Sequence, residues 1–119
     1  MTTDRELLEL AAKAAGIVGK WVDGFGSGDY YYQGNSSGIY YEHATGGYSV
    51  WNPLEDDGDA LRLMVKLRIE VEPWIHGDSA CSRAACGEVL IDEPHYGDDP
   101  ERATRRAIVR AAAAIGSQS

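Results

Sequence analysis

Apolar residues recur at helical spacing near the start of the chain. Those that would share one face of a helix are Leu7, Leu8, Ala11, Ala14 and Ala15. Thr3 and Glu6 form a capping box, in which each side chain accepts a hydrogen bond from the other residue's backbone amide. Gly16 supplies a C-terminal stop. Together these signals predict a helix over residues 4–15.

Two more helices are predicted where acidic residues precede an apolar stripe. Asp56 or Asp57 can cap the second helix, because a carboxylate there satisfies unpaired backbone amides. Its buried stripe is expected to be Ala60, Leu61, Met64, Val65 and Leu67. The third helix starts with Asp99 as the cap and Pro100 at the first helical position, and Gly116 is expected to end it. Its inner face is expected to be Ala103, Ala107, Ile108, Ala111, Ala112 and Ile115.

Short alternating or β-branched runs between the helices predict strands. They cover residues 17–22, 38–43, 48–51, 69–72 and 87–91. The segment 74–86 is expected to be a loop. Trp21 and Trp51 are expected in the core, whereas Trp74 in that loop is the tryptophan best placed to contact a partner.

The resulting element order is α-β-β-β-α-β-β-α. Strands in hairpin order with helices between the sets indicate an α+β fold, an antiparallel sheet with helices packed on it. A chain of 119 residues is long enough for one domain with its own core. The expected organisation is a single domain over 1–119, with a Gly/Tyr-rich insert at 24–48 and a short flexible tail at 116–119.

The insert at 24–48 changes this ordinary picture. It holds half of the chain's 14 glycines and six of its seven tyrosines. Tyrosine gives a large amphipathic contact area at low entropy cost, and glycine and serine let the backbone adapt, a composition typical of recognition surfaces. We therefore expect a protein-binding region here, whose contact residues are Tyr30, Tyr31, Tyr32, Tyr40 and Tyr41.

The net charge of −8 bears on the partner. A negative field repels phosphate, so direct binding to nucleic acid or to an anionic membrane is not expected. A basic protein surface is favoured instead, and imitation of DNA would call for denser acidity. Asp92, Glu93 and Asp98, in an acidic loop, are expected to steer association. The arginines of the third helix (Arg102, Arg105, Arg106 and Arg110) are expected to form a solvated face that pairs with nearby acids.

Residues that could carry chemistry are scattered. His76, Cys81, Cys86 and His95 lack the tight ligand pair of a zinc module, so no metal is expected. The glycines at 24, 26 and 28 do not open a predicted helix, as a dinucleotide site requires. Since no nucleophile motif is present either, the sequence predicts no catalytic residues and no cofactor.

Neither a signal peptide nor an apolar run of about 20 residues is visible, which favours the cytoplasm. There Cys81 and Cys86 would stay reduced, as two unpaired thiols.

Two segments carry a resemblance to a known family. Trp51-Asn52-Pro53-Leu54-Glu55-Asp56-Asp57-Gly58-Asp59-Ala60-Leu61 and Ala103-Thr104-Arg105-Arg106-Ala107-Ile108-Val109-Arg110-Ala111-Ala112 resemble small proteins of tailed phages and prophages. These belong to the phage alpha/beta sandwich type, and NinX-type phage proteins look similar. With the first helix, the resemblance covers about a third of the chain, and residues 24–48 have no counterpart in it. It implies a small acidic accessory protein acting inside a bacterial host, where such proteins often block a host complex, CRISPR–Cas systems included.

Two hypotheses follow from the sequence. The leading one is a phage-encoded binding protein, not an enzyme, that inhibits a host protein complex by occupying a basic surface. The alternative is a small-molecule-binding or hydrolytic phage accessory protein that uses Asp and His residues in a cleft beside the tyrosine hairpin. The sequence leaves the partner's identity and the oligomeric state open.

Overall fold

The computed structural model describes residues 2–25, 36–75, 80–95 and 99–118. Its elements, in chain order, are α1 (Asp4–Ala15), β1 (Gly19–Phe25), β2 (Ser36–Glu42), β3 (Tyr48–Trp51), α2 (Asp57–Leu67), β4 (Glu70–Glu72), β5 (Cys81–Cys86), β6 (Val89–Pro94) and α3 (Pro100–Ser117). The α+β class is confirmed, and the element order agrees with the predicted one apart from one additional strand, β5. Tyr30, Tyr31, Tyr32, His76 and Asp98 lie outside the described residues.

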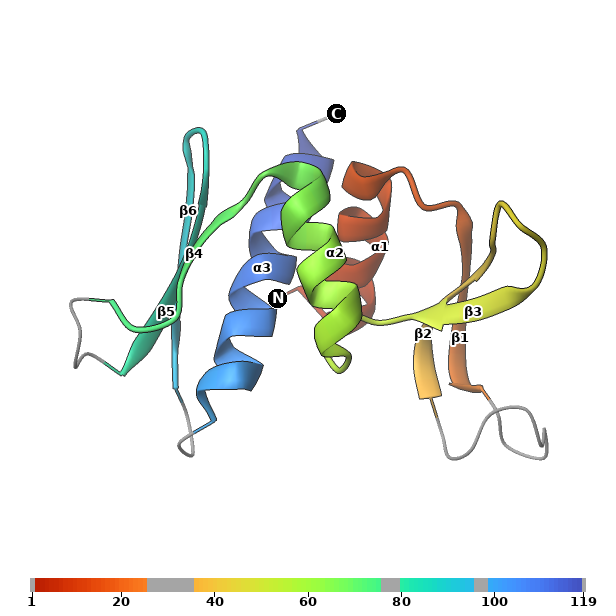
Figure 1. Ribbon diagram of the computed structural model, residues 1–119, viewed down its shortest axis with the longest axis horizontal. Helices are drawn as coiled ribbons and strands as arrows, with labels where there is room; N and C mark the ends of the chain where they lie inside the picture. The colour runs from red at the N-terminus through yellow and green to blue at the C-terminus, as the bar shows by residue number, and fades with distance from the viewer. Residues whose placement is uncertain (1, 26–35, 76–79, 96–98, 119) are drawn as a thin grey trace.

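The three helices form the middle of the molecule, and a sheet stands on either side of them (Figure 1). The first sheet has the strand order β1-β2-β3 and the second β4-β5-β6, and all pairs in both are antiparallel. The prediction of an antiparallel sheet did not specify this division. The molecule is therefore elongated, with extents of 44 × 33 × 29 Å.

The helix starts follow the chemistry of their caps. Thr3 Oγ1 accepts from the Glu6 amide at 3.1 Å, and Glu6 Oε1 accepts from the Thr3 amide at 3.3 Å, so the predicted capping box is confirmed. Asp56, rather than Asp57, caps α2 by accepting from the Asp59 amide at 2.8 Å. Asp99 caps α3 by accepting from the Arg102 amide at 3.0 Å. These bonds satisfy amides that a helix start leaves unpaired.

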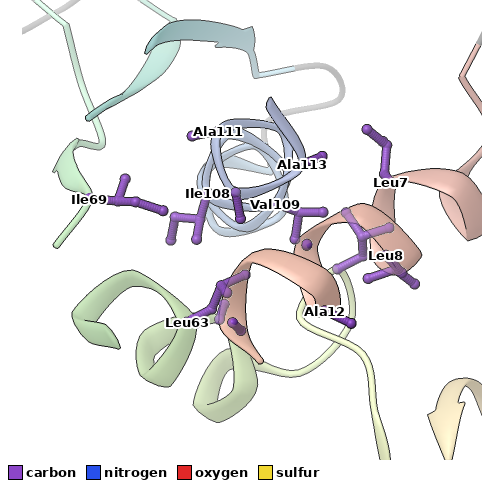
Figure 2. Packing of buried hydrophobic residues seen from close by; sticks show 14 of the residues in the cluster. Leu7, Leu8, Ala12, Leu63, Ile69, Ile108, Val109, Ala111 and Ala113 are labelled. Carbon is purple, nitrogen blue, oxygen red and sulfur yellow. The ribbon is translucent and has the colours of Figure 1, made fainter. Parts of the chain in front are cut away.

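Helix α3 is the element that joins the layers, because it packs against α1, α2 and the second sheet. Figure 2 shows Ile108 directed toward Ile69 and Val109 toward α1. Toward its end α3 approaches α1 so closely that a Cβ at Gly116 would collide with the Leu10 carbonyl oxygen. Gly116 therefore lies buried inside α3, which continues to Ser117, and the prediction that Gly116 ends this helix is wrong.

Two further predictions are corrected by the structure. The predicted loop over 74–86 contains strand β5, whose inward residues Ser82 and Ala84 are fully buried. Small side chains there leave room for the alanine-rich α3, and they lack the bulky alternation that marks a strand in sequence. In α2, Leu61 and Val65 are exposed rather than part of the buried stripe, since Ala60 and Leu63 take the inner positions.

No helix within the described ranges is both long enough and apolar enough to cross a membrane.

Candidate partner-binding cleft

A cleft of about 1290 Å³ lies beside the first sheet. One wall comes from β1, β2 and the hairpin that leads to β3. The other comes from the starts of α1 and α2. The cleft therefore combines three stretches that are far apart in sequence, around residues 4–8, 21–23 and 37–62.

Carboxylates dominate the lining of this cleft. They are Asp4, Asp23, Glu42, Glu55, Asp56 and Asp59. Arg62 is the sole arginine among the described lining residues, and no lysine joins it. Asp4 is partly neutralised from behind by Arg106 at 3.0 Å, and Asp23 accepts from Ser37 Oγ at 2.9 Å. Neither Glu42 nor Glu55 forms an ion pair with any described residue. Such a concentration of like charge favours a cationic occupant.

Aromatic side chains line the same cleft. The strand register places Trp21 and Tyr41 on the inner face of the first sheet. Tyr41 carries His43 beside it, with ring centroids 5.2 Å apart. Arg5 of α1 already lies over Trp21, with its guanidinium carbon 5.7 Å from the ring centroid. This wall therefore offers aromatic faces to a cation.

The two described tyrosines of the predicted contact set point to opposite faces. Tyr41 lines the cleft, whereas its neighbour Tyr40 lies on the outer face of the first sheet, since successive side chains alternate along a strand. There Tyr40 stacks on Tyr48, with ring centroids 5.1 Å apart and an interplanar angle of 14°. A single flat partner surface could not cover both tyrosines at once.

Asp59 is the most buried carboxylate of the cleft. The residue is 8% exposed. Its Oδ2 accepts from the Asn52 amide at 3.0 Å, and its Oδ1 accepts from Arg62 Nη2 at 2.7 Å. The hydrogen bond that Arg62 donates to Asp59 is the main cause that raises the pKa of Arg62, so that guanidinium stays charged. Asp59 thereby ties the turn after β3 to the start of α2.

The two segments that resemble phage proteins meet in space. Arg105 of α3 donates from Nε to the Leu54 carbonyl at 2.9 Å and from Nη1 to Asp57 at 2.7 Å. Comparison with protein-family models, with curated proteins and with solved structures finds no match to this chain. The family resemblance therefore stays a prediction.

Asp92 and Glu93 are not the open loop residues that the sequence predicts, because both belong to β6. Asp92 forms a bidentate pair with Arg83 at 2.7 and 3.0 Å. Glu93 is 8% exposed and pairs with Arg110 at 2.6 Å and with Arg106 at 3.5 Å. The charge of a buried carboxylate that pairs with two arginines is largely neutralised and attracts a partner only weakly. Glu93 instead links β6 to α3.

The same contacts explain the arginines of α3. Arg105, Arg106 and Arg110 each pair with an acid, as the sequence predicts, but the acids come from other elements and the face is not fully solvated, since the Arg105 side chain is only 17% exposed. The partners are Asp57, Asp4 and Glu93, which come from three different elements. Arg102 is exposed. The arginines therefore hold the layers together.

A buried polar cluster lies under Trp74 at the other end of the molecule. Ser82 Oγ is 2.7 Å from His95 Nε2, 2.9 Å from Thr104 Oγ1 and 2.9 Å from the Pro73 carbonyl. The sequence analysis missed this pairing of Ser82 with His95, because Ser82 lies on β5 and His95 follows the end of β6. Trp74 meets the His95 ring edge-on, with centroids 4.6 Å apart.

The protons in this cluster decide what it can do. A carbonyl cannot donate, so Ser82 Oγ donates its hydroxyl proton to the Pro73 carbonyl, while Thr104 Oγ1 donates to the Pro100 carbonyl at 2.7 Å. Which atom donates between Ser82 and His95 depends on the tautomer of the imidazole. Within the described chain His95 Nδ1 has no hydrogen-bond partner. Ser82 is fully buried, so its hydroxyl is not open to a substrate, as a nucleophile would have to be. The cluster therefore acts as a polar anchor for α3 and the Trp74 segment.

The cysteines lie at opposite ends of β5. Because strand residues rise about 3.3 Å each, Cys81 and Cys86 are too far apart to form a disulfide with each other. Both thiols are free. Across the described ranges, no three His, Cys, Asp or Glu side chains group in a way that could hold a metal ion.

Proposed function

We propose that this chain is a small phage-encoded binding protein that inhibits a host protein complex in the bacterial cytoplasm by occupying a basic surface of it. A defence complex of the CRISPR–Cas type is the candidate class, in keeping with the phage resemblance. The observation that carries the proposal is the acidic, aromatic cleft beside the first sheet. Carboxylates that bind cations and rings that stack on guanidinium groups suit an arginine- or lysine-bearing protein segment.

Charge complementarity favours a protein partner over other occupants. The net charge is −8, and the arginines of α3 are mostly taken up by internal pairs. The net negative field therefore repels phosphate, although basic residues such as Lys20 and Arg102 are exposed. A host protein that itself binds nucleic acid presents the opposite field, and occupying that field would block its function.

A tagged chain should capture a stoichiometric partner from bacterial lysate, and the cleft variant Asp23→Asn/Glu55→Gln should lose it. Both acids line the cleft and form no ion pair with a described residue, and Asp23 lies on the same face of β1 as Trp21. The matched control is Glu70→Gln/Glu88→Gln, which removes the same charge from exposed positions on the second sheet. Equal capture by both double variants, or no capture by the natural chain, would contradict the proposal.

The tyrosines of the insert are tested separately. Joint replacement of Tyr30, Tyr31 and Tyr32 by alanine should leave the thermal melt unchanged and abolish capture, since contact tyrosines are often each worth about 2 kcal/mol or more. If the triple variant unfolds, these tyrosines belong to the core and the interface excludes them.

The rival function keeps one supporting observation. His43 lies in the cleft beside several carboxylates, the arrangement that a small-molecule-binding or hydrolytic protein would use. Mass spectrometry of the denatured protein would detect a copurifying nucleotide or other small molecule. Such a ligand, together with failure to capture any protein, would favour this second function.

A further inference from the structure

The guanidinium of Arg62 sits in a cradle at the start of α2. Its Nη2 donates to Asp59 Oδ1 at 2.7 Å and lies 3.8 Å from Asp56 Oδ2. Gly58 forms the floor, because a Cβ there would lie 3.2 Å from both Nη atoms of Arg62. Two carboxylates and the missing side chain of Gly58 thus shape a space that fits one planar guanidinium.

The cradle does not depend on Arg62 for its shape. Asp59 is nine-tenths buried and is held from behind by the Asn52 amide at 3.0 Å. Asp56 is fixed as the N-cap, because it accepts from the Asp59 amide at 2.8 Å. The Arg62 side chain, by contrast, is 70% exposed and reaches the cradle from solvent. Asp56 and Asp59 are therefore held in place, whereas Arg62 is held loosely. An external ligand can displace an internal one that is held in this way.

We propose that this cradle is an arginine-binding subsite of the cleft, which Arg62 fills in the free protein and an arginine of the partner takes over in the complex. The inference rests on the proposed function, since the partner supplies the incoming arginine. Arginine suits the site better than lysine because a planar guanidinium can bridge two carboxylates while lying flat over Gly58. Trp21 and Tyr41 line the same cleft and would accept further cations of the partner segment.

Competition by Arg62 lowers the apparent affinity of the cleft. A site that is open only part of the time binds a ligand more weakly, in proportion to its open fraction. Removing the Arg62 guanidinium should therefore strengthen binding of an arginine ligand. The gain should be modest, about fivefold, because an exposed ion pair holds its partner only weakly.

The probes are a tetra-arginine and a tetra-lysine peptide, whose dissociation constants are measured by titration calorimetry at low salt. Arg62→Ala and Arg62→Gln should each bind the arginine peptide about fivefold more tightly than the natural chain, and the lysine peptide should gain less. Arg83→Ala is the matched control, because it makes the same change in net charge on the second sheet, where Arg83 pairs with Asp92. Equal gains in the Arg62 and Arg83 variants would overturn the proposal.

Gly58→Ala, made together with Arg62→Gln, tests the shape of the cradle. The added methyl group fills the floor and should reverse the gain for the arginine peptide. Alanine is also the better helix former, although its Cβ would lie 3.2 Å from Asp56 Oδ2 as well, so a thermal melt that does not fall shows that lost binding does not reflect unfolding. Unchanged binding in this double variant would place the arginine elsewhere and overturn the proposal.

The two proposals can fail separately. If lysate capture depends on Asp23 and Glu55 but not on Arg62, the partner uses the cleft and the arginine subsite is wrong. If the peptides behave as expected but the natural chain captures no protein, the subsite is real and the inhibitory function is wrong.

Discussion

Trp51 and Gly116 show most directly how single residues shape this core. Trp51 fills the space where the first sheet meets the helices and is 3% exposed. It faces Ile39 across the pair of β2 and β3, where neighbouring side chains pack closely. Gly116 does the opposite, since it leaves space empty so that α3 can touch the backbone of α1.

Replacing Trp51 by alanine should cost about 3–5 kcal/mol of unfolding free energy, because the cavity would open inside a packed core. Chemical denaturation monitored by circular dichroism measures the loss. Leu61→Ala is the control, because Leu61 is exposed on α2 and alanine suits a helix. A Trp51 variant as stable as the Leu61 variant would show that the first sheet is not part of the core.

Gly116→Ala should be destabilising although alanine is the better helix former. The new Cβ would collide with the Leu10 carbonyl oxygen, which belongs to the backbone and cannot turn away. We expect a loss of about 3 kcal/mol, at the upper end of the usual cost of overpacking. Ser117 is exposed, so the control substitution Ser117→Ala should change stability little. A stabilised Gly116 variant would mean that α1 and α3 lie farther apart.

At the scale of elements, the second sheet and α3 are joined by charge as well as by packing. Glu93 on β6 holds Arg106 and Arg110 of α3, and Ser82 on β5 holds Thr104. These ties cross from strand to helix at several heights along α3.

Glu93→Gln should destabilise the fold, in contrast to the mild effect expected of a loop residue. Glu93 is buried, but the Arg106 and Arg110 side chains are 32% and 40% exposed, so the cost should be about 1–2 kcal/mol, below the roughly 3–5 kcal/mol of breaking a fully buried pair. Asp92→Asn is the control on the same strand, because its pair with Arg83 is exposed to water and screened. Thermal melts that shift equally for both variants would contradict the buried role of Glu93.

Sequence prediction succeeded for elements with local signals and failed where packing between elements decides the structure. Residues 4–15 and 48–51 were predicted with their observed bounds, because caps and alternation are local signals. Strand β5 was missed because its inward side chains are small. Small residues are needed there because α3 packs against the strand, and they lack the bulky alternation that marks a strand in sequence. Leu61 and Val65 were placed inside because amphipathic spacing does not show which apolar positions meet a neighbour. Trp21 and Tyr41 form one cleft wall only because folding pairs β1 with β2. Neither segment alone shows this pairing.

The whole molecule carries a net charge of −8, and six carboxylates line its cleft against one arginine. Association with a basic partner should therefore slow by about tenfold as salt rises from low to physiological levels or above, since screening weakens steering. Surface plasmon resonance against the captured partner separates the two rates, and dissociation should change much less. Salt-independent association would show that the acidity serves solubility and that aromatic contacts carry recognition.

The central place of α3 also bears on how the protein is made. Every other described helix and strand precedes it along the chain, yet α1, α2 and the second sheet bury their apolar faces against it. While the ribosome is still translating residues before Pro100, those faces have nothing to cover them. The nascent chain should then bind chaperones and resist folding until α3 emerges, because contacts between distant segments close late.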